Sequence, residues 1–178
     1  MKRLLNVALL LLSIAAWQNT QAQTYCEYSI GFAWCGPGWE VDDITIGSFS
    51  EQNGGCNNNA PYSKNLSTAI TVSKGTPTSF TLGSGGTPVQ WAIWVDCNAD
   101  GDFTDASDYF WGSLTPSTTV SSTMLIPASA SASQSRIRIA SRNQSIAIIK
   151  NDACNFGFQA ETQDFTIVMN APGGCSTP

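Results

Sequence analysis

Hydrophobic and polar residues alternate along several short segments of the chain, a pattern that predicts β-strands. The clearest segment is Val89–Asp96, in which Trp91, Ile93 and Val95 would share one face and the residues between them the other. The segment Asp164–Met169 alternates in the same way. Period-two alternation is typical of a sheet that packs against a core on one side. Strands are therefore expected near Val41–Phe49, Ala69–Ser73, Ser79–Leu82, Val89–Asp96, Tyr109–Gly112, Val120–Ile126, Arg136–Ser141, Ile146–Lys150 and Thr162–Met169.

Gly, Pro, Asn and Ser separate these segments, and no heptad or amphipathic helical repeat stands out. Short strands at regular spacing predict an all-β fold, a single antiparallel β-sandwich of the jelly-roll or Ig-like kind. The stretches Asn53–Asn59 and Thr115–Thr119 are expected to be loops. Arg136 and Arg138 alternate with isoleucines, so they are expected either on a solvated face or paired with carboxylates of a neighbouring strand.

The first 22 residues have the three-part pattern of a secretory signal. Lys2 and Arg3 begin it, the apolar run Leu4–Trp17 follows, and small residues end it at Ala22. The run is shorter than the roughly 20 apolar residues that cross a bilayer, so cleavage is expected rather than a membrane anchor. Removing 22 of the 178 residues leaves 156, starting at Gln23. Residues 23–170 are expected to form one domain, and residues 171–178 a linker or the start of a further segment.

The acidic charge and the lack of histidine narrow the classes of function. The formal net charge is −5, and it becomes about −7 without the two cations of the signal segment. This charge argues against nucleic acid as a partner, because its phosphates need basic residues. With no histidine, Ser-His-Asp, Cys-His and HExxH chemistry are excluded. An enzyme built on this chain would depend on carboxylates, with Asp96, Asp100, Glu161 and Asp164 as candidates.

An even number of cysteines follows the predicted signal segment, which indicates disulfides in an exported chain. Six cysteines allow 15 connectivities, so spacing alone does not choose among them. A zinc site is disfavoured, because the chain has no CxxC pair and no histidine. The cysteines are Cys26, Cys35, Cys56, Cys97, Cys154 and Cys175.

A loop crowded with acidic and amide side chains follows the predicted strand Val89–Asp96. Its opening, D-x-N-x-D-G, places oxygen ligands at alternate positions and a glycine where the chain reverses, as a calcium loop requires. Position 12 would be Ser107 rather than glutamate, and the loop is entered from a strand, so it is not an EF-hand. The expected calcium ligands are Asp96, Asn98, Asp100, Asp102, and Asp105 or Asp108.

Two other interpretations of this loop remain open. A plain turn needs one Asp-Gly pair and not several carboxylates, whose repulsion would be costly without a cation. A carboxylate acid/base pair of the glycosidase kind would need a substrate cleft, which nothing else in the sequence indicates. Calcium is the favoured interpretation, and the ion would mainly hold the loop and the strands that it joins.

The order of these motifs resembles the GEVED domain, a β-rich module of exported bacterial proteins. Its opening Tyr-Cys is seen at Tyr25 and Cys26, and its S-T-x-x-x-V-x-x-G segment at Ser67–Gly75. The most specific piece is the acidic loop, where "WVDCNADGDFTD" spans Trp94–Asp105. The resemblance extends from Tyr25 to about Met169.

The motif that gives the family its name appears here as "AETQDF", residues 160–165. Glu161 and Asp164 are kept, whereas Ala160, Thr162 and Gln163 depart from the pattern. If this motif packs beside the acidic loop, Glu161 and Asp164 would support the calcium shell from a second layer of contacts.

The resemblance implies the disulfides and the context of the protein. It implies a bridge between Cys26 and Cys154. Cys35 and Cys56 are then the natural partners across the loop-rich first section, and Cys97 and Cys175 remain as a third pair. The family is regarded as non-catalytic and is found in secreted and cell-surface proteins, frequently of Bacteroidetes-like bacteria. Its ligand is not generally established.

The leading hypothesis is a secreted or cell-surface binding and adhesion module that calcium stabilises. Its partner would be an extracellular protein or a glycan, with no nucleic acid and no membrane insertion after signal cleavage. A carbohydrate-binding module is the alternative, since exposed tryptophans can stack on sugar rings. Trp34 and Trp39 lie in a Gly/Pro-rich stretch and are the favoured platform, ahead of Trp94 and Trp111. A carboxylate glycoside hydrolase is the third hypothesis.

Overall fold

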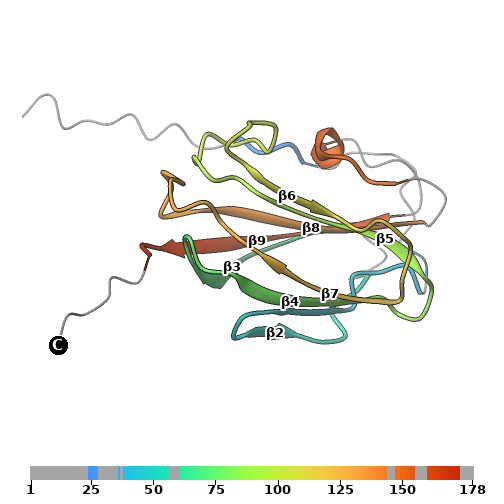
Figure 1. Ribbon diagram of the computed structural model, residues 1–178. Coiled ribbons are helices and arrows are strands. Elements are labelled where there is room, and N and C mark those ends of the chain that lie inside the picture. Colours follow the sequence, from blue (N-terminus) through green and yellow to red (C-terminus); the bar gives the residue numbers. More distant parts are fainter. Residues whose placement is uncertain are drawn as a thin grey trace, which may run out of the picture.

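The computed structural model describes residues 24–27, 36, 38–56, 61–143, 147–154 and 160–172. These residues form two facing β-sheets, which confirms the predicted all-β sandwich (Figure 1). The four-stranded sheet has the order β2-β1-β4-β7, and the five-stranded sheet the order β3-β9-β8-β5-β6. The elements are β1 (Asp43–Ile46), β2 (Phe49–Glu51), β3 (Tyr62–Ser73), β4 (Thr78–Gly83), β5 (Val89–Val95), β6 (Tyr109–Gly112), β7 (Thr119–Met124), β8 (Gln134–Asn143), the 3-10 helix η2 (Lys150–Cys154) and β9 (Ala160–Asn170).

Neighbouring strands pair antiparallel in both sheets, with one exception. β3 runs parallel to β9, and the register between them shifts between Asn65 and Ala69. The sheet is therefore mixed, which differs from the fully antiparallel arrangement expected. A parallel pair needs a long connection, and here the connection contains strands β4 to β8.

Two of the predicted strands differ from the structure. The expected strand Val41–Phe49 is a hairpin, because Gly47, with φ of 57°, allows a tight turn that pairs Ile46 with Phe49. The expected strand Ile146–Lys150 is wrong from residue 147 onward, since residues 147–149 have no regular structure and Lys150 begins η2. The Asp152 carboxylate accepts the backbone N–H of Ile149 and thereby caps the start of this helical turn.

The main core lies between the two sheets. Trp91, Ile93 and Val95 of β5 are fully buried there, as the alternation predicts. Phe165 of β9 and Leu82 of β4 belong to the same cluster. The side chains that fill it come from both sheets, so the hydrophobic effect joins the two layers.

The outer face of the five-stranded sheet is covered as well. All seven residues of β5 are buried, including Trp94. This strand is therefore packed on both of its faces, and not on one face as its alternation predicts. Trp94 belongs to a second cluster with Tyr25, Phe103 and Ala153. These residues come from the N-terminal segment, the acidic loop and η2, which form a partial third layer (Figure 1).

Within the described residues, no helix has the length and apolar character needed to cross a membrane. The predicted signal segment, residues 1–22, and residues 173–178 lie outside them. The proposed division into signal, domain and linker stays a prediction.

Candidate metal centre

The acidic loop begins with a buried carboxylate that organises its backbone. Asp96 is fully buried, and its oxygens accept the N–H groups of Asn98 at 3.2 Å, Ala99 at 2.6 Å and Gly101 at 3.1 Å. Ala99 and Gly101 have φ angles of 62° and 101°, where the chain reverses. The predicted glycine therefore stands where the turn needs it. Asp96 fixes the turn, and both of its carboxylate oxygens already accept hydrogen bonds.

Asp108 fixes the other end of the loop in the same manner. Its carboxylate accepts the N–H of Cys97 at 2.9 Å and that of Asp105 at 3.1 Å. Burial raises the pKa of Asp108 above its ordinary value. The Lys150 ammonium donates to the backbone carbonyls of Asp105 and Asp108, so η2 also supports this end.

Three other carboxylates of the loop converge. Asp100, Asp102 and Asp105 each offer a carboxylate oxygen, and these atoms lie within 4.8 Å of one another. The Asn98 amide donates to Asp100 at 2.8 Å and to Asp105 at 2.6 Å, which places an amide at the same point. A hydrogen bond with the Asp100 carboxyl raises the pKa of Asp105, as expected of crowded like charges.

The chemistry of this donor set fits a hard divalent cation. The converging atoms are carboxylate oxygens, which calcium and magnesium prefer, whereas the Asn98 amide oxygen accepts the backbone N–H of Asp100 at 3.2 Å. Asp100, Asp102 and Asp105 could hold the ion, and Asn98 lies beside them with its NH2 group directed at Asp100 and Asp105. Of the six residues predicted as ligands, three converge through carboxylate oxygens, Asn98 donates hydrogen bonds to two of these, and Asp96 and Asp108 shape the loop.

Tyr25 joins the N-terminal segment to this loop. Its hydroxyl donates to the Asp96 carboxylate at 2.6 Å, and its ring packs against Phe103 with centroids 5.4 Å apart. The Arg136 guanidinium lies 3.9 Å from the Tyr25 ring centroid, within cation–π range. The sequence did not indicate that Tyr25 would contact the acidic loop, and no motif marked Lys150 as a residue that supports it.

Asp164 lies at the centre of the outer layer. It accepts two hydrogen bonds from Arg138, at 2.7 Å and 2.8 Å, and one from the Tyr62 hydroxyl at 2.7 Å. Both Asp164 and Arg138 have fully buried side chains. Pairing of the strand arginines with a neighbouring carboxylate is confirmed, and the solvated alternative is wrong for Arg138. Arg136 also reaches Asp164, at 3.3 Å, so Asp164 is linked to the acidic loop through Arg136 and Tyr25.

Glu161 does not support the acidic loop, contrary to the expectation for it. Glu161 of β9 pairs with Ser141 of β8, which in turn pairs with Trp91 of β5. Trp91 lies five residues before Asp96, where the acidic loop begins. At about 3.3 Å per residue, this spacing puts Glu161 roughly 16 Å from the start of the loop.

The partners of Glu161 are backbone groups at the other end of the sandwich. Its carboxylate accepts the N–H groups of Val41 at 2.6 Å and Cys56 at 3.1 Å, and the Gln163 amide at 3.1 Å. Burial raises the pKa of Glu161 to about 7, although these hydrogen bonds oppose the shift. The two carboxylates of the AETQDF motif therefore fasten different parts of the fold.

The structure tests two of the cysteine predictions. Cys26 and Cys154 form a disulfide, as the resemblance implied. Cys56 is disulfide-bonded too, but its predicted partner, Cys35, lies outside the described residues. The predicted bridge from Cys97 to Cys175 is wrong, because Cys97 is a free thiol that is fully buried in the main core. Burial raises the pKa of Cys97 to about 11, so the thiol stays protonated.

The described tryptophans do not form an exposed platform. Trp39 packs against the main core, and Trp111 contacts Phe80 edge to face with centroids 4.9 Å apart. Trp94 is fully buried. Trp34, the other favoured residue for sugar stacking, lies outside the described residues.

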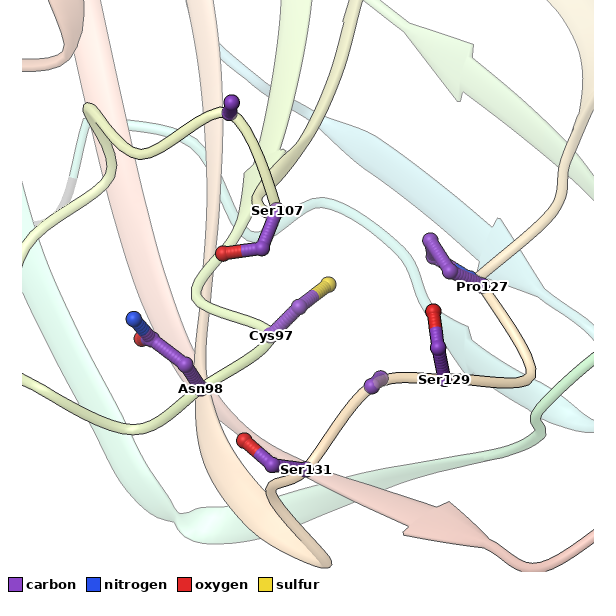
Figure 2. Close-up of a pocket in the computed structure, with 8 residues that line it drawn as sticks. Cys97, Asn98, Ser107, Pro127, Ser129 and Ser131 are labelled. Atoms are coloured by element: carbon purple, nitrogen blue, oxygen red, sulfur yellow. The ribbon is translucent and has the colours of Figure 1, made fainter.

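A pocket lies between the acidic loop and the connection from β7 to β8. Its volume is about 230 Å³, below the roughly 300–1,000 Å³ that ligand pockets usually have. Figure 2 shows the Cys97 sulfur and the Ser129 hydroxyl pointing into the space between the two loops. Among the described residues that line it none is charged, and their side chains offer hydroxyl, amide and thiol groups. The lining residues are Cys97, Asn98, Ala106, Ser107, Pro127, Ser129, Ala130 and Ser131.

Comparison with known proteins gives one match. No curated protein and no solved structure is significantly similar to the chain. The family model of the GEVED domain matches residues 90–168, which contain most of β5, the acidic loop, β8 and most of β9. This is the part of the resemblance that holds Asp96, the converging carboxylates and the Arg138–Asp164 pair. The resemblance to the GEVED domain family is therefore confirmed over residues 90–168.

Proposed function

We propose that this chain is an exported, non-catalytic binding or adhesion module whose acidic loop holds one calcium ion. The observation that carries the proposal is the convergence of Asp100, Asp102 and Asp105, whose carboxylate oxygens lie within 4.8 Å of one another. Three negative charges this close repel one another, and a divalent cation would relieve the repulsion. When bound, the ion supplies charge neutralisation and a crosslink within the loop, and no chemistry on a substrate.

Export and the absence of catalysis are supported by other features. The signal-like first 22 residues and the Cys26–Cys154 disulfide are typical of proteins that mature in an oxidising compartment. Of the carboxylates considered for acid/base work, Asp96, Glu161 and Asp164 are fully buried, and each accepts hydrogen bonds that the fold depends on. The partner would be an extracellular protein or a glycan. The packing of the described tryptophans favours a module without a sugar-stacking platform among them.

Isothermal titration of the mature chain with calcium tests the proposal. We expect one site per chain, with magnesium binding more weakly, because flexible oxygen cages suit the larger ion. Asp100→Asn and Asp105→Asn should each weaken calcium binding. Asp43→Asn is the matched control, because Asp43 is an acidic residue of β1 outside the loop. A parent chain that takes up no calcium at millimolar concentration would contradict the proposal.

A further inference from the structure

Two segments distant in sequence make contact with the acidic loop. Tyr25, 71 residues before Asp96, donates its hydroxyl to the Asp96 carboxylate at 2.6 Å. Lys150 donates its ammonium to the carbonyls of Asp105 and Asp108, the latter at 3.1 Å. One contact is on the residue that shapes the turn, and the other is at the point where the loop ends.

A disulfide joins these two segments. Cys26 follows Tyr25 directly, and its partner Cys154 ends η2, the helical turn that begins at Lys150. Arg138 of β8 binds both sides of this bridge, because it donates to the carbonyls of Cys26 and Ala153. The Trp94 indole donates to the Lys150 carbonyl at 2.8 Å and attaches η2 to β5.

We infer that Tyr25, Lys150 and the Cys26–Cys154 disulfide act as one latch that sets the affinity of the acidic loop for calcium. Tyr25 and Lys150 are positioning residues in this scheme, since neither belongs to the converging oxygen set. The inference rests on the proposed calcium site and concerns how that site is regulated.

The physical reason is preorganisation. Asp96 holds the N–H groups of Asn98, Ala99 and Gly101, so a shift of its carboxylate moves the backbone that carries the ligands. Without the latch the loop samples more conformations, and calcium must order it on binding. The ordering cost lowers the affinity without changing a ligand.

Coupling of this kind is reciprocal. If the disulfide strengthens calcium binding by some factor, calcium must make the disulfide harder to reduce by the same factor. Reduction by a dithiol transfers two electrons and two protons, so Cys26 and Cys154 become thiols while the dithiol closes into its own cyclic disulfide. Calcium enters neither side of this exchange and acts only by stabilising the oxidised, latched form.

The experiment compares Tyr25→Phe with Tyr62→Phe in the oxidised chain. Each variant removes one tyrosine hydroxyl that donates to a buried aspartate, at 2.6 Å to Asp96 and at 2.7 Å to Asp164. We expect Tyr25→Phe to weaken calcium binding about tenfold, the scale of one hydrogen bond to a charged group. Tyr62→Phe should leave the calcium dissociation constant unchanged, although both variants lower the melting temperature of the calcium-free chain.

A second arm uses the disulfide itself. The double variant Cys26→Ser/Cys154→Ser should bind calcium more weakly than the parent. In the parent, calcium should raise the dithiol concentration that is needed to open this bridge. Peptide mass spectrometry follows the reduction of the Cys26–Cys154 bridge separately from that of any other. If the double variant fails to fold, Tyr25→Phe decides, since its disulfide is intact.

The outcomes separate the latch from the site. A parent chain that binds calcium, together with a Tyr25→Phe variant that binds it equally well, would overturn the latch and leave the calcium site standing. The same holds if Tyr62→Phe weakens binding as much as Tyr25→Phe, because the effect would then be general loss of stability. A parent chain that binds no calcium would refute the site and the latch together.

Discussion

Replacing Asp164 by asparagine should destabilise the domain more than any exposed charge change. The substitution keeps the shape of the side chain but removes the negative charge opposite Arg138. Both side chains of this pair are fully buried, and Arg138 also lies 5.0 Å from the Phe103 ring centroid and 5.5 Å from that of Tyr62. The variant would leave a guanidinium in a low-dielectric layer without its counter-charge.

The expected magnitude follows from that burial. Removing one partner of a buried ion pair costs about 3–5 kcal/mol, against a total stability of about 5–15 kcal/mol for a domain. At about 2–4 °C per kcal/mol for a chain of this size, the melting temperature should fall by about 6–20 °C. Urea unfolding with the disulfides intact measures the free energy directly, and an unchanged m-value would show that the comparison is sound.

The control is Glu27→Gln, the same chemical change in an ion pair at the surface. Glu27 pairs with Lys64, and the two side chains are 65% and 36% exposed. Solvent screening makes such pairs weak, so no measurable change in melting temperature is expected. The double variant Arg138→Met/Asp164→Leu should recover part of the loss, because it removes both charges of this pair. If Asp164→Asn is no less stable than Glu27→Gln, the reasoning about the outer layer fails.

Two further predictions concern buried titratable groups. The folded pKa of Glu161 is raised to about 7 from an ordinary value of 4.5, so its folded form holds the proton more tightly. Its contribution to stability should be complete below pH 4.5 and be lost, by up to about 3 kcal/mol, as the pH rises to 7. Glu161→Gln should flatten this slope in unfolding curves measured at several pH values, and an unchanged slope would contradict the assignment. Cys97, buried with a pKa of about 11, should resist alkylation in the native chain and react only after unfolding. Peptide mapping that finds modified Cys97 under native conditions would show that the core is open there.

The alternation of residues predicted the inner face of the sandwich well. Trp91, Ile93 and Val95 lie in the main core because hydrophobic side chains at every second position can share one buried face. The same alternation carried two signals that were missed. Continued by two residues, it places Cys97 in the core, where no disulfide forms. Applied to β9, it puts Glu161 on the face of Phe165, between the sheets, and separates it from Asp164 on the outer face.

The sequence could not assign the roles within the acidic loop. Asp96 and Asp100 are both aspartates of one motif, yet the first holds backbone N–H groups and the second faces the other carboxylates. Asp96 also accepts the Tyr25 hydroxyl from a distant part of the chain, a contact that no local pattern indicates. The parallel pairing of β3 with β9 is also a long-range property, because no local pattern fixes which strands become neighbours.

Thermal unfolding of the mature chain, with excess calcium and with a chelator, tests the central claim most directly. If calcium binds the native state alone, a hundredfold excess over the dissociation constant stabilises it by about 2.7 kcal/mol. This corresponds to a rise in melting temperature of about 5–11 °C for the parent and little or none for Asp100→Ala. Identical melting of the parent in calcium and in chelator would contradict the claim that the loop is a calcium site, and a shift that survives Asp100→Ala would place the ion elsewhere.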